Sequence, residues 1–188
     1  MTEEQKFKVV DRMQGYELRS YQPCVVAEVE ISAKFETAAN EAFRYLINYI
    51  GGKNEARNKI AMTAPVLQIP SPSASFTEGE VDDLNSQSHL VSFVMPSEMH
   101  LGNTPAPDDS RINIRELPEE LVAVLKFSGR WSKERYLHQL EVLKGKLAAD
   151  GFQEVDDARF ARFDPPWTPW FLRRNEIQIP VKKIGSKD

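Results

Sequence analysis

The sequence has few of the residues that most often build catalytic and metal centres. Its 188 residues include one cysteine, Cys24, and three widely separated histidines, His89, His100 and His138. A single cysteine excludes an internal disulfide and a thiolate metal site, and the histidines lack the spacing of metal ligands. The G-x-S-x-G, H-E-x-x-H, G-x-x-x-x-G-K-S/T, G-x-G-x-x-G and C-x-x-C patterns are absent. We therefore expect neither an enzyme nor a metal site built from side chains.

The sequence also lacks long apolar runs and an excess of positive charge. No stretch approaches the 18 consecutive apolar residues that would predict a membrane-spanning helix. The first ten residues, MTEEQKFKVV, lack the apolar region of a secretory signal, so the expected location is cytoplasmic. A net charge of −4 argues against nucleic acid or an anionic membrane as the main partner. The oligomeric state is left open.

Two helices are predicted by apolar residues at helical spacing. The first covers residues 35–50, with Ser32 as its expected N-cap and Gly51 as its stop. The second follows Ser132 and ends at Gly151. The apolar stripe of the first helix comprises Phe35, Ala39, Ala42, Phe43, Leu46, Ile47 and Ile50, and that of the second comprises Tyr136, Leu140, Leu143 and Leu147.

Strands are predicted before and after each helix. Residues 16–31 are expected to form two strands around a turn at Gln22-Pro23, and residues 111–117 and 121–127 a second strand pair. Further strands are expected at residues 89–95, 152–163 and 176–181. Residues 70–88, rich in Ser, Pro, Asp and Glu, are expected to form a mobile loop without chemistry of its own.

The two halves of the chain resemble each other. Leu18-Arg19 matches Ile114-Arg115, and residues 25–27 match residues 121–123 at the same offset. The sequence therefore predicts one α+β domain, residues 1–188, built from a duplicated strand–strand–helix–strand–strand unit. The repeat halves are expected at about residues 9–95 and 111–182, with two helices packed on a curved antiparallel sheet.

Two segments stand out by their composition. The first is GGKN at residues 51–54, continuing into KIAMTAPV at residues 59–66. The second is FDPPWTPWFLRRNEIQIP at residues 163–180, of which residues 164–173 are called the arch below. Proline fixes the backbone φ angle, so the three prolines of the arch can hold its two tryptophans as rigid plates.

These segments, together with YELRSY and SFVMPSE, resemble the SOUL haem-binding protein family, which includes the p22 haem-binding proteins. The resemblance extends from about Tyr16 to Val181. It implies a distorted antiparallel β-barrel flanked by two long helices. It also implies non-covalent, reversible binding of haem b or another tetrapyrrole in a shallow apolar cleft, as expected for a haem carrier or buffer.

The resemblance and the residue chemistry together indicate the ligand contacts. Apolar and aromatic side chains would pack on the macrocycle, a thioether would offer a soft contact, and cations would pair with the propionates. The stretch ISAKFETAANEAFRYL has no histidine, so the axial iron ligand is expected to be weak, absent or His100. The expected contacts are Phe43, Ile47, Arg57, Lys59, Met62, Trp167, Trp170, Arg173 and Glu176, with Arg174 a further candidate for the propionates.

Other interpretations of the same residues remain open. A sensor or interaction module could bind another amphipathic or cationic ligand between the two repeats, with Glu176 as a buried carboxylate. A more distant resemblance, of fold only, to drug-sensing effector domains of bacterial transcription regulators favours this alternative. A third interpretation is an enzyme that acts on a tetrapyrrole or a small hydrophobic ester. In a purely structural interpretation, the tryptophans close the end of the barrel and an arginine pairs with Glu176.

Overall fold

The chain forms two units, and each is built from two separate segments of the sequence. The computed structural model describes residues 2–70 and 87–185, so nearly all of the loop expected at 70–88 lies outside the described residues. Unit 1 consists of Met1–Gln5 and Cys24–Leu117. Unit 2 consists of Lys6–Pro23 and Pro118–Asp188.

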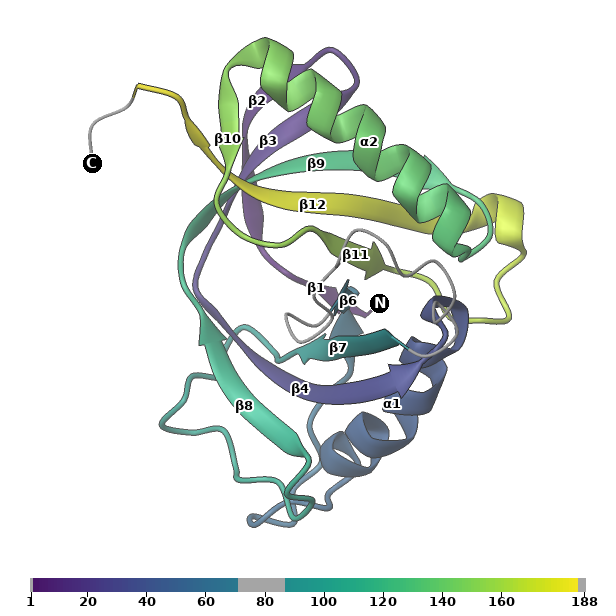
Figure 1. Ribbon diagram of the computed structural model, residues 1–188. Helices are drawn as coiled ribbons and strands as arrows, with labels where there is room; N and C mark the ends of the chain where they lie inside the picture. The colour runs from purple at the N-terminus through teal and green to yellow at the C-terminus, as the bar shows by residue number, and fades with distance from the viewer. Residues whose placement is uncertain (1, 71–86, 186–188) are drawn as a thin grey trace. The chain divides into compact units, whose positions relative to one another are not determined.

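Unit 1 is an antiparallel sheet with one helix packed on it. Helix α1 (Phe35–Ile50) lies along β4 and β7, as Figure 1 shows. A short parallel pair, β1 (Glu3–Glu4) and β5 (Thr63–Ala64), adjoins the sheet. The strands of the sheet are, in spatial order, β6 (Val66–Pro70), β7 (Gln87–Val94), β4 (Cys24–Ala33) and β8 (Ile112–Leu117).

The core of unit 1 lies between α1 and this sheet. Leu46 and Tyr49 of the helix are fully buried, and they pack with alternate residues of β4 such as Ala27. This confirms the expected apolar stripe, although Phe43 is 37% exposed and Ile47 only half-buried. Because neither residue lies at the centre of the core, both retain surface that a ligand could contact.

The start of α1 differs from the expected one. The N-cap is Lys34, whose side chain makes no capping bond, so the assignment to Ser32 was wrong. Ser32 instead belongs to β4, because the ladder between β4 and β7 continues to Ala33 and fixes the backbone as a strand. The expected stop at Gly51 is confirmed: its N–H donates to the Ile47 carbonyl at 2.9 Å.

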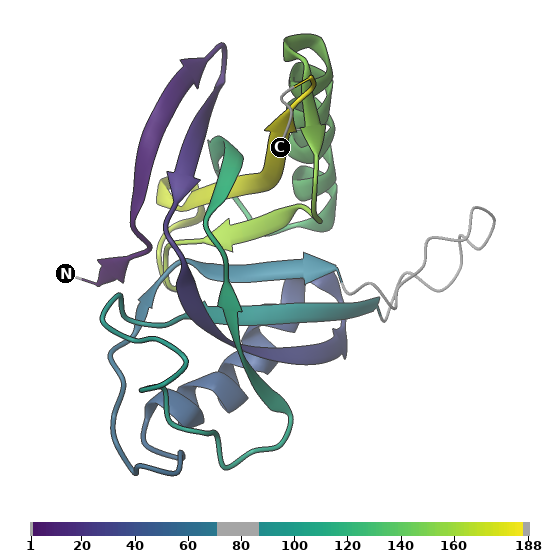
Figure 2. The ribbon, with the colours of Figure 1, turned by 90° about the vertical axis from the view of Figure 1, so that its left-hand side faces the viewer.

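Unit 2 contains antiparallel strands and one helix, α2 (Lys133–Asp150). In Figure 2, β2 (Phe7–Met13) and β3 (Tyr16–Tyr21) form the purple hairpin. A single 3-10 turn, η1 (Trp170–Leu172), lies within the arch. The strands are, in spatial order, β2 (Phe7–Met13), β3 (Tyr16–Tyr21), β9 (Glu120–Ser128), β12 (Arg174–Lys183) and β11 (Arg159–Arg162), with β10 (Phe152–Glu154) also paired to β12.

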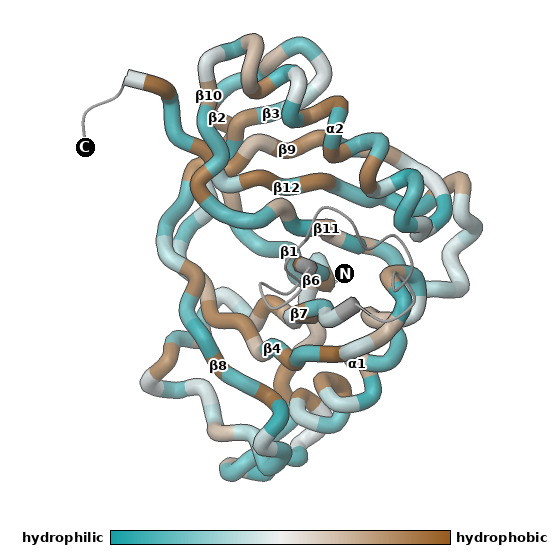
Figure 3. The backbone as a smooth tube through the Cα atoms, in the orientation of Figure 1, coloured by the Kyte–Doolittle hydropathy of each residue, from teal (hydrophilic) through white to brown (hydrophobic). Residues whose placement is uncertain are grey.

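Helix α2 has the predicted ends and the predicted buried face. The Ser132 hydroxyl accepts from the Arg135 N–H at 3.3 Å, and Gly151 adopts φ 76°, a left-handed conformation that glycine tolerates best. Tyr136 is buried 5.5 Å from the ring of Phe160 in β11. Residues 121–125 of β9 are all apolar, whereas Figure 3 shows apolar and polar residues alternating along much of β12.

At two places in the chain, strands that follow each other in the sequence do not pair with each other. The expected pairing of residues 111–117 with 121–127 was wrong, because β8 pairs with β4 whereas β9 pairs with β3 and β12. Likewise β3 and β4 pair with different partners. Both connections contain a proline, Pro23 or Pro118, and both pass from one unit to the other. The α+β class with antiparallel sheets and two long helices is confirmed, whereas the closed barrel and the duplication stay predictions.

Candidate functional site

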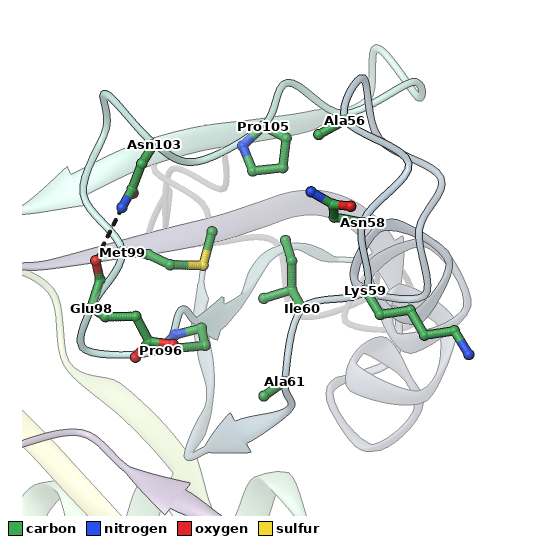
Figure 4. Close-up of a pocket in the computed structure, with 10 residues that line it drawn as sticks. All are labelled: Ala56, Asn58, Lys59, Ile60, Ala61, Pro96, Glu98, Met99, Asn103 and Pro105. Atoms are coloured by element: carbon green, nitrogen blue, oxygen red, sulfur yellow. Dashed lines mark hydrogen bonds between the residues drawn. The ribbon is translucent and has the colours of Figure 1, made fainter.

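A small open pocket lies in unit 1, beyond the C-terminal end of α1. Its volume is about 250 Å³, and two loops form its walls, residues 51–62 and residues 96–105. Figure 4 shows the side chains that surround it. The lining residues are Ala56, Asn58, Lys59, Ile60, Ala61, Pro96, Glu98, Met99, Asn103 and Pro105.

Asn54 holds the first loop in its shape. Its side chain is fully buried, and Nδ2 donates to the carbonyls of Tyr49 at 3.0 Å and Asn58 at 2.8 Å. Its Oδ1 accepts from the Asn58 N–H at 3.2 Å. The neighbouring Glu55 N–H donates to the Ala106 carbonyl at 2.9 Å, which ties this loop to the chain that follows the other wall. One amide side chain therefore positions the wall that carries Lys59 and Ile60.

Tyr49 fastens the second loop. Its ring is fully buried in the core, and its hydroxyl donates to the Pro105 carbonyl at 2.8 Å. Burial raises the pKa of this phenol to about 12, because the charged phenolate would lose its hydration. Both walls of the pocket are thus anchored to the last turn of α1.

We expect Tyr49→Phe to lower the free energy of unfolding by about 1 kcal/mol at pH 7, through loss of the bond to Pro105. This difference should shrink as the pH rises from about 10 toward 12. The unfolded phenol ionises near pH 10 and the folded one near pH 12, so alkali destabilises the wild type but spares the variant at this position. Urea unfolding of the wild type and of Tyr49→Phe at pH 7 and at about pH 11 measures this difference in the free energy of unfolding. An unchanged difference at the two pH values would contradict this role of Tyr49.

The floor of the pocket is apolar and its rim is polar. Figure 4 shows the side chains of Ile60 and Met99 projecting into its centre, and both also pack against the core under α1, as does Ile47. Asn103 Nδ2 donates to the Glu98 carbonyl at 3.1 Å and so closes one end. Such an arrangement suits a flat apolar group with charged substituents at its edge.

Three of the sequence-predicted residues lie on the first wall. Lys59 lines the pocket, and its amine points away from the cavity in Figure 4. Met62, 41% exposed, follows the lining residue Ala61. Arg57 lies between two lining residues, and its Nη1 is 2.5 Å from Oδ2 of Asp108 in an exposed ion pair. Two cations and a thioether therefore lie on one loop.

The aromatic residues of the arch lie in unit 2 and are exposed. Trp167 is 82% exposed and Trp170 46% exposed. Arg173 is engaged within the arch: its Nε donates to the Thr168 carbonyl at 2.8 Å, and its guanidinium lies 4.2 Å from the ring centre of Trp131. These contacts brace the arch with the cation that was expected at the propionates.

Glu176 is buried inside unit 2, where it forms a bidentate ion pair with Arg19. The oxygen–nitrogen distances are 3.0 and 3.1 Å, and the residues are 2% and 1% exposed. The Gln178 amide donates to the same carboxylate at 3.0 Å, and the Tyr21 hydroxyl accepts from Arg19. Burial alone would lower the pKa of Arg19, but the adjacent carboxylate raises it above its ordinary value. The charge of Glu176 is therefore neutralised within its own unit.

One ring nitrogen of His100 is engaged in a hydrogen bond. Nδ1 accepts from the Gly102 N–H at 3.1 Å, within a turn that Asn103 also stabilises. A neutral imidazole that accepts through Nδ1 carries its proton on Nε2. The Nε2 atom then has no lone pair to offer an iron, so this turn does not favour His100 as an axial ligand.

Sequence reasoning missed four residues that shape the pocket: Tyr49, Asn54, Ile60 and Met99. Asn54 follows the paired glycines 51–52, where a buried polar side chain is needed to satisfy backbone groups of an irregular loop. Met99 lies in a loop bordered by Pro96 and Pro105. The prolines at the two ends of this loop and the apolar residues Met99 and Leu101 within it were the available signal.

Two features are absent from the described residues. No group of three or more His, Cys, Asp or Glu side chains in residues 2–70 and 87–185 is placed to hold a metal ion. Within the same ranges, no helix is both long and apolar enough to cross a membrane.

The fold defines an α+β domain seen in proteins of quite different sequence. The EcmrR C-terminal domain is similar with a TM-score of 0.62 at 14% identity, over 90% of this chain and 98% of that one. A hydrolase from Listeria innocua is similar with a TM-score of 0.60 at 8% identity, over 92% and 94%. At these identities the likeness shows the fold alone.

The sequence comparison shows the family. Residues 2–180 match the SOUL heme-binding protein family, and the chain belongs to it. Heme-binding protein 2 of Homo sapiens is 35% identical over 180 residues, which are 93% of this chain and 82% of that protein. Heme-binding protein 1 of Mus musculus is 30% identical over 168 residues, 88% of this chain and 83% of that protein.

Proposed function

We propose that this protein binds haem or another tetrapyrrole non-covalently at the pocket of unit 1 and acts as a carrier or buffer for it. The observation that carries the proposal is an apolar floor of Ile60 and Met99 beside a loop with two cations, Arg57 and Lys59. Membership of the SOUL heme-binding protein family supports it.

The size of the pocket limits how a tetrapyrrole would lie. A cavity of about 250 Å³ is smaller than the range of roughly 300–1,000 Å³ that encloses whole small-molecule ligands. One edge of the macrocycle would enter between Ile60 and Met99, and its remaining face would rest on exposed apolar surface such as Met62. Phe43 and Ile47, on the partly exposed side of α1, are candidates for further contact. When bound, haem would supply an iron centre that this chain's side chains do not build.

The propionates of such a ligand would meet Arg57 and Lys59. The ion pair of Arg57 with Asp108 is exposed, and such pairs contribute only about 0–1 kcal/mol. A propionate can therefore replace Asp108 at little cost, and it gains a charge-assisted hydrogen bond. Lys59 needs only a rotation of its flexible stem to turn its amine toward the rim.

Met99 lines the pocket and Met62 follows the lining residue Ala61, so their thioether sulfurs would be soft ligands for the iron. Thioethers bind iron without the strength of an imidazole. Binding through apolar contact, propionate pairing and a weak axial ligand is expected to be reversible. Reversible binding suits transfer of a cargo more than a resident redox centre.

Haem titration of the purified protein is expected to saturate at one equivalent, followed by its absorption and by tryptophan fluorescence. Met99→Ala should weaken binding about tenfold, because roughly 1.4 kcal/mol of apolar contact is lost. The double variant Arg57→Ala with Lys59→Ala should weaken haem but not a porphyrin without carboxylates. Leu101→Ala is the matched control, since Leu101 lies on the same loop, is 50% exposed and does not line the pocket.

The carrier role requires release as well as binding. Mixing the loaded protein with excess apomyoglobin should transfer haem completely, with a rate that rises in Met99→Ala. Retention of haem against this acceptor would contradict the carrier role, and non-saturating binding that is equal in all variants would contradict the site.

The alternative function, a sensor for cationic ligands, would need Glu176 to exchange Arg19 for the ligand. No part of the haem-binding proposal uses Glu176.

A further inference from the structure

The arch of unit 2 presents the most exposed group of large apolar side chains that the structure describes. Trp167 is 82% exposed, Leu172 65%, Phe171 58% and Trp170 46%. All four lie within six consecutive residues. Single exposed apolar side chains are common on protein surfaces, but four together on one short segment indicate an interaction site.

The arch is braced, so this exposure is not that of a loose loop. The guanidinium of Arg173 donates to the carbonyls of Pro166 at 2.5 Å and Thr168 at 2.8 Å. At its base, Asp164 Oδ2 accepts from the Arg174 N–H at 2.6 Å. Three prolines further restrict the backbone. The apolar side chains are therefore held outward at small entropic cost on binding.

Arginines lie beside the arch: one contacts Trp170, and another directly follows the arch in the sequence. The guanidinium of Arg130 lies 5.6 Å from the ring centre of Trp170, and that of Arg174 lies 3.7 Å from the ring centre of Phe163. The side chain of Arg135 lies over Gly129, next to Arg130 in the sequence. Arg130, Arg135 and Arg174 are all exposed.

The nearby acidic charge is smaller. Asp164 accepts from the backbone at the base of the arch, and Glu134 stands in the first turn of α2. Glu176, three residues beyond the arch, is buried in its ion pair with Arg19. The arch is thus locally basic, although the whole chain carries a net charge of −4. The overall charge had argued against an anionic membrane as the main partner, but it does not describe this surface.

We propose that the arch docks the protein on an anionic lipid surface. Tryptophan and phenylalanine favour the boundary between lipid headgroups and acyl chains, and Leu172 would insert beside them. The surrounding arginines would attract the negative headgroups. The attachment is peripheral and reversible, because one short arch buries far less apolar area than a spanning helix. The proposal uses residues of unit 2 alone.

Sedimentation with lipid vesicles tests the proposal. The wild-type protein should co-sediment with phosphatidylcholine vesicles containing about one third phosphatidylserine, and at least about fivefold less with pure phosphatidylcholine. The double variant Trp167→Ser with Leu172→Ser should lose about tenfold or more of the binding to the anionic vesicles. Acyl-chain-brominated lipids should quench the tryptophan fluorescence of the wild type, and the quenching should fall in Trp167→Ser.

A matched control separates the arch from general stickiness. Leu101→Ser with Leu137→Ser removes two other exposed leucines, 50% and 42% exposed, and should bind as the wild type does. Arg130→Glu with Arg135→Glu should weaken binding to anionic vesicles and leave binding to neutral ones unchanged. Absence of wild-type binding, an equal loss in the leucine control, or equal binding to neutral vesicles would each overturn the proposal. Haem titration of the variant Arg130→Glu with Arg135→Glu should give wild-type affinity.

Discussion

Glu176→Ala is expected to lower the free energy of unfolding by about 3 kcal/mol. The change leaves the guanidinium of Arg19 buried, at 1% exposure, without its bidentate partner. Removing one member of a buried pair typically costs about 3–5 kcal/mol, because the remaining charge keeps its desolvation cost. The lower end is expected here, since Glu17 Oε2 still accepts from Arg19 at 3.0 Å.

Urea unfolding with a double-mutant cycle isolates this effect. Arg19→Met combined with Glu176→Leu should be much less destabilising than either single change, because no charge is left buried. Glu141→Ala, which removes an exposed glutamate of the same unit, is the matched control and should change stability by less than about 0.5 kcal/mol. Equal costs for Glu176→Ala and Glu141→Ala would contradict the role of the pair.

Asn54→Ala is expected to lower the free energy of unfolding by about 2–3 kcal/mol. The substitution removes three hydrogen bonds, one to the Tyr49 carbonyl and two to the backbone of Asn58. Because Asn54 sets the shape of the wall that carries Lys59 and Ile60, tetrapyrrole affinity should fall as well. Asn54 itself does not line the pocket, so its effect on affinity acts through loop position.

The two effects of Asn54→Ala can be measured separately. Urea unfolding gives the stability, and haem titration at a temperature where the variant is still folded gives the affinity, expected to fall about tenfold. Asn48→Ala, which changes an exposed asparagine in the last turn of α1, should leave both unchanged. Full affinity in a destabilised Asn54→Ala protein would show that the pocket does not depend on this loop geometry.

The sequence predicted the elements better than their pairing. Helical spacing placed α1 and α2, and Ser132 and Gly151 marked the ends of α2, because these are local signals. The pairing of β8 with β4 and of β9 with β3 depends on contacts between distant segments, which a window of sequence does not contain. Ser32 was misassigned for the same reason, since the ladder with β7 overrode the local cap preference.

The candidate site was predictable in part. The motif KIAMTAPV led to Lys59 and Met62, which the structure places at the wall of a pocket or next to it. The opposite wall, with Met99, could not be paired with it from sequence alone. Arg173 and Glu176 have partners inside unit 2, Thr168 and Arg19, and only the fold identifies these partners. A charged residue in a conspicuous motif can thus serve the architecture of that motif.

Unit 2 combines strands from early and from late in the chain, and this has a consequence for synthesis on the ribosome. Unit 1 has all its strands once Leu117 has emerged, whereas β2 and β3 belong to unit 2 and must wait for β9, about 100 residues later in the chain. During that interval the hairpin of β2 and β3 lacks its neighbouring strand, and an isolated hairpin is at best marginally stable. The nascent chain therefore exposes an unpaired strand edge until its last third is made, which is the period when a chaperone would be of most use to it.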